Sequence, residues 1–213
     1  MTSIVLSSGH GQKVRGACGI IDEVDEARRV ADRLAQELEK RGVDVKVFHD
    51  NVSTSQSANL NAIVNYHNAQ ERDLDISVHF NAYEQVEKPM GVEVLYVTQQ
   101  SLAAKLSDAI AEAGGFINRG AKKRTDLKFL NSTDEPAVLL EICFVDSEAD
   151  CALYDEGFDS ICDAIADVLG GAEEITEPEP PSGEVPVSRV DITIECDDDV
   201  MIYVNGVQVG TKG

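Results

Sequence analysis

The sequence predicts an α/β fold, with a twisted, mostly parallel sheet of about six strands covered by helices on both faces. Over residues 1–171, short apolar segments alternate with segments whose apolar residues recur at helical spacing. The clearest helical segment, residues 22–41, ends at Gly42, a residue type favoured just beyond a helix. Residues 137–140 are all apolar, as in a strand that is covered on both faces.

The individual elements follow from the same patterns. Strands are expected at residues 4–7, 43–48, 74–79, 91–97 and 137–141. Helices are expected at residues 22–41, 57–71, 101–113 and 158–169.

Three domains or segments are expected along the chain. Residues 1–171 form the α/β domain, and residues 172–186 form an acidic linker rich in proline and glutamate. Residues 187–213 alternate apolar and polar side chains, with a turn signal at Asn205-Gly206, which predicts two or three strands. So small a β unit buries little core alone, so we expect it to self-associate, to dock, or to open a longer module.

Composition excludes several classes of partner. A net charge of −21 argues against binding to nucleic acid or anionic lipid headgroups. No apolar run approaches the roughly 20 residues that a membrane span needs, so membrane insertion is not expected. The first residues lack a basic segment, so no secretory signal is expected. The five cysteines include no CxxC pair, and Cys143, Cys151 and Cys162 are expected to be buried free thiols.

Four residues are candidates for chemistry. His10 follows the first expected strand, while His79 and Glu141 end later strands, and such strand ends border the ligand crevice of open α/β sheets. Glu23 lies in the first turn of a helix. Two histidines and a carboxylate form a standard catalytic zinc shell, and a further carboxylate can then carry a proton. This interpretation requires the imidazoles of His10 and His79 to lie within about 5 Å of each other.

Several neighbouring residues have alternative interpretations. Asp22, Asp25 and Glu26 compete with Glu23 for the carboxylate position, although Asp22 is better explained as a helix N-cap. His49 is a substitute ligand, a substrate contact or a solvated loop residue. His67, in the middle of a helix, is interpreted as structural.

A basic cluster and an acidic run also stand out. The cluster of Arg119, Lys122, Lys123 and Arg124 is either a solvated loop or a site for a substrate carboxylate or an oxyanion. The acidic run 197–199 lacks the spaced ligands of a calcium loop and is interpreted as a turn.

The motifs around these residues resemble those of the type 3 N-acetylmuramoyl-L-alanine amidases. The matching segments are Ser8-Gly9-His10-Gly11, Gly19 to Glu23, Ile76 to Ala82, Arg119 to Lys122, and Glu135 to Val145, in family order across residues 2–170. The resemblance implies Zn²⁺ bound by His10, Glu23 and His79, and Glu141 as the catalytic residue. It further implies hydrolysis of the bond between muramic acid's lactyl group and L-alanine in peptidoglycan. Asn81, Arg119 and Lys122 are the expected substrate contacts. One departure is Phe48-His49-Asp50, where the family often has Thr-Arg before an Asp.

The linker and small C-terminal unit resemble those of phage endolysins. That resemblance implies synthesis in the host cytoplasm without a signal peptide, followed by action on the bacterial cell wall after release. Two alternatives remain for the α/β domain: a zinc peptidase acting on the stem peptide, or a wall-binding module that has lost activity. The C-terminal unit could bind wall glycans or form a homo-oligomer.

Overall fold

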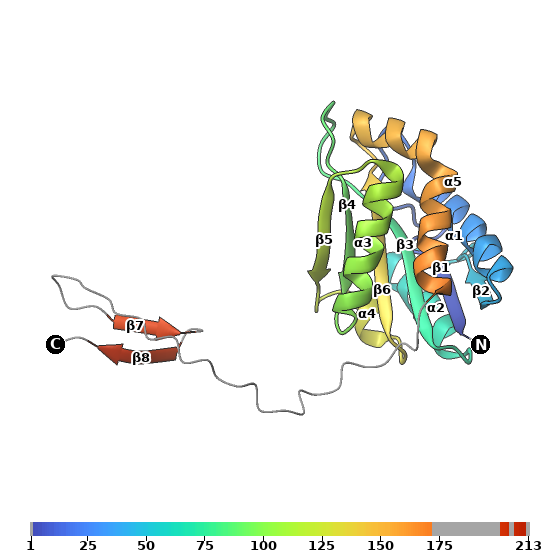
Figure 1. The fold of residues 1–213 in the computed structure, drawn as a ribbon. Helices are drawn as coiled ribbons and strands as arrows, with labels where there is room; N and C mark the ends of the chain where they lie inside the picture. The colour runs from blue at the N-terminus through green and yellow to red at the C-terminus, as the bar shows by residue number, and fades with distance from the viewer. Residues whose placement is uncertain (1, 172–200, 205–206, 212–213) are drawn as a thin grey trace. The chain divides into compact units, whose positions relative to one another are not determined.

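The computed structural model describes residues 2–171, 201–204 and 207–211. The chain divides into two compact units, Met1–Glu177 and Pro178–Gly213, and each is described by itself. The first unit contains a six-stranded sheet and five helices (Figure 1). Its strands are β1 (Ser3–Ser8), β2 (Asp44–Phe48), β3 (Leu74–Asn81), β4 (Val92–Tyr96), β5 (Asn118–Lys123) and β6 (Ala137–Phe144). Its helices are α1 (Glu23–Lys40), α2 (Gln56–Asn68), α3 (Gln100–Gly114), α4 (Lys128–Ser132) and α5 (Glu148–Gly170).

The strand order β2-β1-β3-β6-β4-β5 makes the sheet mostly parallel, as the sequence predicts. The strands β2, β1, β3 and β6 run in the same direction, whereas β4 and β5 run opposite to them. The starts of β4 and β5 therefore lie at the same sheet edge as the ends of β1, β3 and β6. This shared edge is where His10, His79 and Glu141 lie.

Helices cover both faces of the sheet. Helices α1, α3 and α5 share the larger core with one face, which contributes Leu6, Ile76, Val78 and Leu140. Helices α2 and α4 share a smaller core with the other face, through Ile63, Phe129 and the strand residues Leu95 and Leu139. Because side chains alternate along a strand, Glu141 points to the same face as Leu139, and Glu93 to the same face as Leu95. The face with the smaller core thus also carries these two carboxylates.

Two strands extend further than the sequence predicts. β3 continues to Asn81 and β6 to Phe144, so His79 and Glu141 lie inside strands and do not end them. The residues that follow are mostly apolar and buried, and Asn81 pairs with Phe144 across the two strands. The predicted placement at strand ends is therefore wrong in detail, although both residues lie near the correct sheet edge.

Helix α5 starts at Glu148, ten residues before the predicted start at residue 158. Ser147 caps it, with its hydroxyl accepting the N–H of Asp150 at 3.1 Å. Asp150 is buried and accepts the N–H groups of Met90, Gly91 and Phe144 at 2.8–3.2 Å. The first turns of α5 are rich in charged residues and so lack an apolar pattern. One of these residues, Asp150, is buried because it accepts backbone N–H groups from other segments.

Strand β5 and helix α4 were not predicted at all. β5 has the sequence NRGAKK, whose polar side chains suit an edge strand that is largely exposed. Helix α4 has only five residues, too few for a helical period to be visible.

The second unit contains an antiparallel pair of strands, β7 (Met201–Val204) and β8 (Val207–Thr211). The predicted linker 172–186, residues 187–200 of the predicted β unit with the acidic run 197–199, and the turn residues Asn205 and Gly206 lie outside the described residues. Cys143, Cys151 and Cys162 are buried and free, as expected. Among the described helices, none has the length and apolar character needed to cross a membrane.

Candidate metal centre

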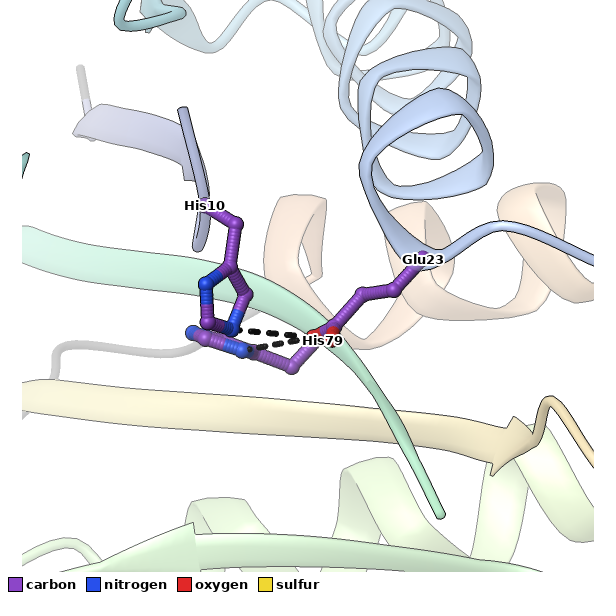
Figure 2. A group of neighbouring side chains, drawn as sticks. All are labelled: His10, Glu23 and His79. Atoms are coloured by element: carbon purple, nitrogen blue, oxygen red, sulfur yellow. Dashed lines mark hydrogen bonds and ion pairs between the residues drawn. The ribbon is translucent and has the colours of Figure 1, made fainter. Parts of the chain in front are cut away.

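Three side chains from separate elements converge near the end of β1 (Figure 2). His10 lies in the loop after β1, Glu23 is the first residue of α1, and His79 lies in β3. One nitrogen of each histidine and one carboxylate oxygen lie within 4.8 Å of one another. The imidazole centroids of His10 and His79 are 5.1 Å apart, at the limit of about 5 Å that the zinc interpretation sets, and in Figure 2 the dashed lines from both rings lead to the Glu23 carboxylate.

Glu23 is the residue that links the two histidines. Its Oε1 lies 2.9 Å from His79 Nδ1 and 3.5 Å from His10 Nε2. It also accepts the backbone N–H of Ala17 at 2.6 Å and that of Phe80 at 3.2 Å. Burial opposes ionisation of Glu23, but the hydrogen bond and charge of His79, together with His10 and the N–H of Ala17, lower its pKa. Glu23 is therefore a buried, oriented carboxylate.

The competing carboxylates near Glu23 point elsewhere. Asp22 caps α1 by accepting the N–H of Val24 at 2.9 Å, and its side chain pairs with Arg15. Asp25 also pairs with Arg15. Glu26 accepts the hydroxyl of Tyr154 at 2.8 Å and pairs with Arg29. Only Glu23 among these carboxylates faces the two histidines.

The two histidines differ in proton affinity. Burial and the nearby charge of His79 lower the pKa of His10, against the opposing effect of Glu23. Burial also acts to lower the pKa of His79, but its hydrogen bond to Glu23 and the charge of Glu141 outweigh burial and raise it. A metal ligand must be a neutral imidazole, and the surroundings of His10 favour that form.

Two glycines make room for this cluster. A Cβ atom at Gly9 would lie 1.8 Å from Nε2 of His79, and one at Gly16 would lie 2.0 Å from Oε2 of Glu23. Neither glycine has a positive φ, so close approach and not backbone conformation requires them. A tight cradle of this kind, filled by nitrogen and carboxylate donors, suits a divalent cation such as zinc.

Glu141 lies beside the cluster on the next strand. It is opposite His79 in the pairing of β3 with β6, and opposite Glu93 in the pairing of β6 with β4. The three side chains therefore form a row across adjacent strands. Burial raises the pKa of Glu141 to about 7, assisted by the charges of Glu23 and Glu93 and opposed by His79. Its Oε2 is buried without a hydrogen-bond partner among the described residues, which leaves it available for proton transfer.

Two of the three predicted substrate contacts, Asn81 and Arg119, bind a residue that the sequence analysis missed, Glu93. Asn81 donates to its Oε1 at 3.0 Å, and Arg119 donates to its Oε2 at 2.9 Å. Lys122 is exposed on β5, and the described residues offer it no hydrogen bond or ion pair. Glu93 could have been found by the signal that identifies Glu141, since it is a lone charge within an apolar strand.

His49 is not a metal ligand in this arrangement. Its Nδ1 pairs with the hydroxyl of Ser8 at 2.9 Å, and its Nε2 with the carboxylate of Asp32 at 3.1 Å. Both ring nitrogens are thus engaged, and His49 links the end of β1 to α1. His67 is fully buried at the end of the sheet away from the metal centre. Its Nδ1 forms a hydrogen bond with the carboxylate of Asp75, near the start of β3, at 2.7 Å.

The fold and cluster together define an α/β domain with a candidate metal centre of two histidines and a glutamate. The family model described as N-acetylmuramoyl-L-alanine amidase matches residues 4–170, and the chain belongs to this family.

Individual relatives and a solved structure are similar to this chain. An uncharacterised 38.4 kDa protein of Clostridium perfringens is 31% identical over 161 residues, covering 72% of this chain and 46% of that protein. A probable cell wall amidase, LytH, of Staphylococcus epidermidis is 29% identical over 160 residues, covering 72% of this chain and 52% of that protein. The chain thus spans about half the length of these curated relatives. The catalytic domain of the CD27L endolysin targeting Clostridia difficile superimposes with a TM-score of 0.72 and 27% identity, covering 79% of this chain and 97% of that one.

Proposed function

We propose that the protein hydrolyses the amide bond between N-acetylmuramic acid and L-alanine in bacterial peptidoglycan, using a zinc ion bound by His10, Glu23 and His79. The observation that carries the proposal is the convergence of these three donors, within 4.8 Å of one another, beside the buried Glu141. Membership of the amidase family supports the choice of substrate. Two imidazoles and one carboxylate are a donor set that zinc favours.

In this mechanism a zinc ion, when bound, polarises the amide carbonyl and makes a water molecule more acidic. Glu141 accepts a proton from the attacking water, and its raised pKa of about 7 suits a group that must then release that proton. Water oxygen joins the lactyl carbonyl carbon and the C–N bond breaks. Glu141 passes its proton to the departing nitrogen, so the products are a lactyl carboxylate and the free amine of L-alanine.

We also propose that the protein acts on the cell wall in the manner of an endolysin, since the CD27L catalytic domain is among its structural neighbours. The unit containing β7 and β8 is then proposed to retain the enzyme on the wall or to associate with a second copy. It is a separate compact unit whose two described strands are too small a structure to be stable alone. Deletion of residues 172–213, followed by measurement of wall retention and of mass in solution, distinguishes these two roles.

The decisive experiment uses purified cell walls and the Glu141→Gln variant. Wild-type protein is expected to release new L-alanine amino groups while the sugars stay intact, and a zinc chelator is expected to stop the release. Glu141→Gln is expected to lower the rate at least about 100-fold, because general acid–base catalysis contributes about 10²–10⁴-fold. Zinc binding should be retained. New amino groups on other residues would instead indicate a peptidase.

Glu135→Gln is the matched control. Glu135 is exposed just before the opposite end of β6, so the same substitution there should leave activity unchanged. A Glu141→Gln variant with wild-type activity would remove the proposed proton carrier. Wild-type protein that binds walls without cleaving them would indicate an inactive binding module.

A further inference from the structure

Arg119 occupies a special position in the edge strand β5. In the pairing of β4 with β5, Val92 lies opposite Asn118 and Glu93 lies opposite Gly120, which leaves Arg119 as the extra residue of a β-bulge. Such bulges redirect a side chain and are common beside active sites. Here the bulge turns the Arg119 guanidinium toward the row that contains Glu93 and Glu141.

The Arg119 side chain is held from three sides. Its Nε donates to Oε2 of Glu93 at 2.9 Å, and its Nη1 approaches the carbonyl oxygen of Met90 at 3.4 Å. Its guanidinium carbon lies 5.0 Å from the ring centroid of Phe144, a cation–π contact. Met90 is itself held by the carboxylate of Asp150. Arg119 is therefore a fixed cation, although its side chain is 36% exposed.

The fixed guanidinium still has capacity to bind. Of its five N–H groups, the contacts to Glu93 and Met90 use the one on Nε and one of the two on Nη1, and no hydrogen bond is found for Nη2 among the described residues. An exposed arginine with an oriented edge matches a carboxylate, which it can bind through two parallel hydrogen bonds. In a chain of net charge −21, such a site also supplies local attraction for an anionic substrate.

The position of Arg119 sets which part of the substrate it reaches. Glu93 is two strands from His79 in the row, and neighbouring strands are about 4.8 Å apart, so the Glu93 carboxylate that holds the Arg119 guanidinium lies roughly 10 Å from His79. An extended peptide advances about 3.3–3.6 Å per residue. A carboxylate roughly 10 Å beyond the scissile bond therefore belongs to the second or third residue of the stem peptide.

We propose that Glu93 is a positioning residue that clamps Arg119 as the receptor for a free carboxylate on the second or third residue of the stem peptide. The proposal rests on the proposed function, because it takes peptidoglycan as the substrate. The carboxylate has two sources: the α-carboxylate of a D-glutamate at the second position, or the side-chain carboxylate of a diaminopimelate at the third. Amidation of either group removes its charge.

The test uses soluble muramyl tripeptides in three forms: both carboxylates free, the second residue amidated, or the third residue amidated. For wild-type protein, amidation of one of the two residues is expected to raise KM about 5- to 30-fold, and the residue concerned identifies the source. The kcat is expected to change less than about twofold, because a contact away from the reacting atoms binds the ground state and transition state equally.

The variants separate the clamp from a structural role. Arg119→Gln and Glu93→Gln should both raise KM for the free-carboxylate substrate and abolish the discrimination among the three substrates. Loss of stability alone would not change that ratio. Lys105→Gln, which removes the same charge from an exposed position on α3, is the control and should keep the wild-type preference. Equal KM values for the three substrates with wild-type protein overturn the proposal, as does preserved discrimination in Glu93→Gln.

Calorimetric binding of the same three muropeptides distinguishes this inference from the proposed function. If wild-type protein hydrolyses all three with equal KM, the carboxylate site is wrong and the amidase assignment stands. If no amine is released but binding still depends on one carboxylate and on Arg119 and Glu93, the site stands and the assignment of the reaction is wrong.

Discussion

The substitution Gly16→Ala tests whether His10 and Glu23 are held in place for a metal ion. The added Cβ would lie 2.0 Å from Oε2 of Glu23 and 2.5 Å from Cδ2 of His10. The Glu23 oxygen must therefore move by about 1.5 Å to reach the ~3.5 Å at which contacts with carbon become favourable. Metal–ligand distances tolerate only about 0.2 Å, so the displaced carboxylate is no longer correctly placed.

The expected cost falls mainly on metal binding, with a smaller cost to folding. Altering the surroundings of a metal ligand typically lowers affinity about 10- to 100-fold, and we expect a loss of at least that size. The Glu23 carboxylate is the far end of a flexible side chain, so the fold can accommodate the methyl group. Disturbing its hydrogen bond from Ala17 should cost about 1–2 kcal/mol of unfolding free energy.

The assay is a zinc titration in competition with a chromogenic chelator, combined with urea denaturation of the metal-free protein. Gly157→Ala is the control, because a Cβ there meets no atom closer than 3.4 Å and an alanine suits the interior of α5. It should leave zinc affinity unchanged. Zinc affinity in Gly16→Ala within about twofold of the wild type, with the fold intact, would refute the reasoning about this cradle.

Two further predictions concern stability. Burial opposes ionisation of Asp50, but hydrogen bonds from Ser53 and Asn59 outweigh it and lower its pKa to about 2. Relative to an unfolded value near 4, the lowered pKa of Asp50 contributes about 2.5 kcal/mol of stability, which is present above about pH 4 and lost as the pH falls through about 2. The free energies of unfolding of wild type and Asp50→Asn, measured by urea denaturation, should therefore differ less at pH 2.5 than at pH 6. A difference that stays constant with pH would contradict this prediction. Asp75→Asn should destabilise the protein by about 3–5 kcal/mol, because it leaves the buried Arg72 without its carboxylate partner. Zinc affinity should stay unchanged, because Asp75 lies at the start of β3, at the end of the sheet away from the metal centre. Thermal denaturation tests the first result and zinc titration the second.

The helices and central strands were predictable because their information is local. The apolar spacing in residues 22–41 follows one face of a helix, and the buried face of α1 matches it. The charged first turns of α5 hid its start, because Asp150 is buried to hold Met90 and Gly91. The spacing of apolar residues along a helix depends on neighbouring residues only, so it cannot show that Asp150 forms a hydrogen bond with a residue some sixty positions away.

The identity of the candidate ligands was also accessible from the sequence, through the motifs around His10, Glu23 and His79. The direction of β4 and β5 was not, since two strands of either orientation have the same pattern of side chains. That direction places the start of β4, and hence Glu93, beside Glu141 at the sheet edge.

The chain by itself determined which residue types are available for the chemistry and which elements carry them. Tertiary structure alone decided which of them meet. His49 became a link between Ser8 and Asp32, and Arg119 became a clamped cation, because strand order and a bulge set distances that the spacing along the chain does not encode. Contacts between distant segments depend on how the layers pack, and packing is a property of the whole domain.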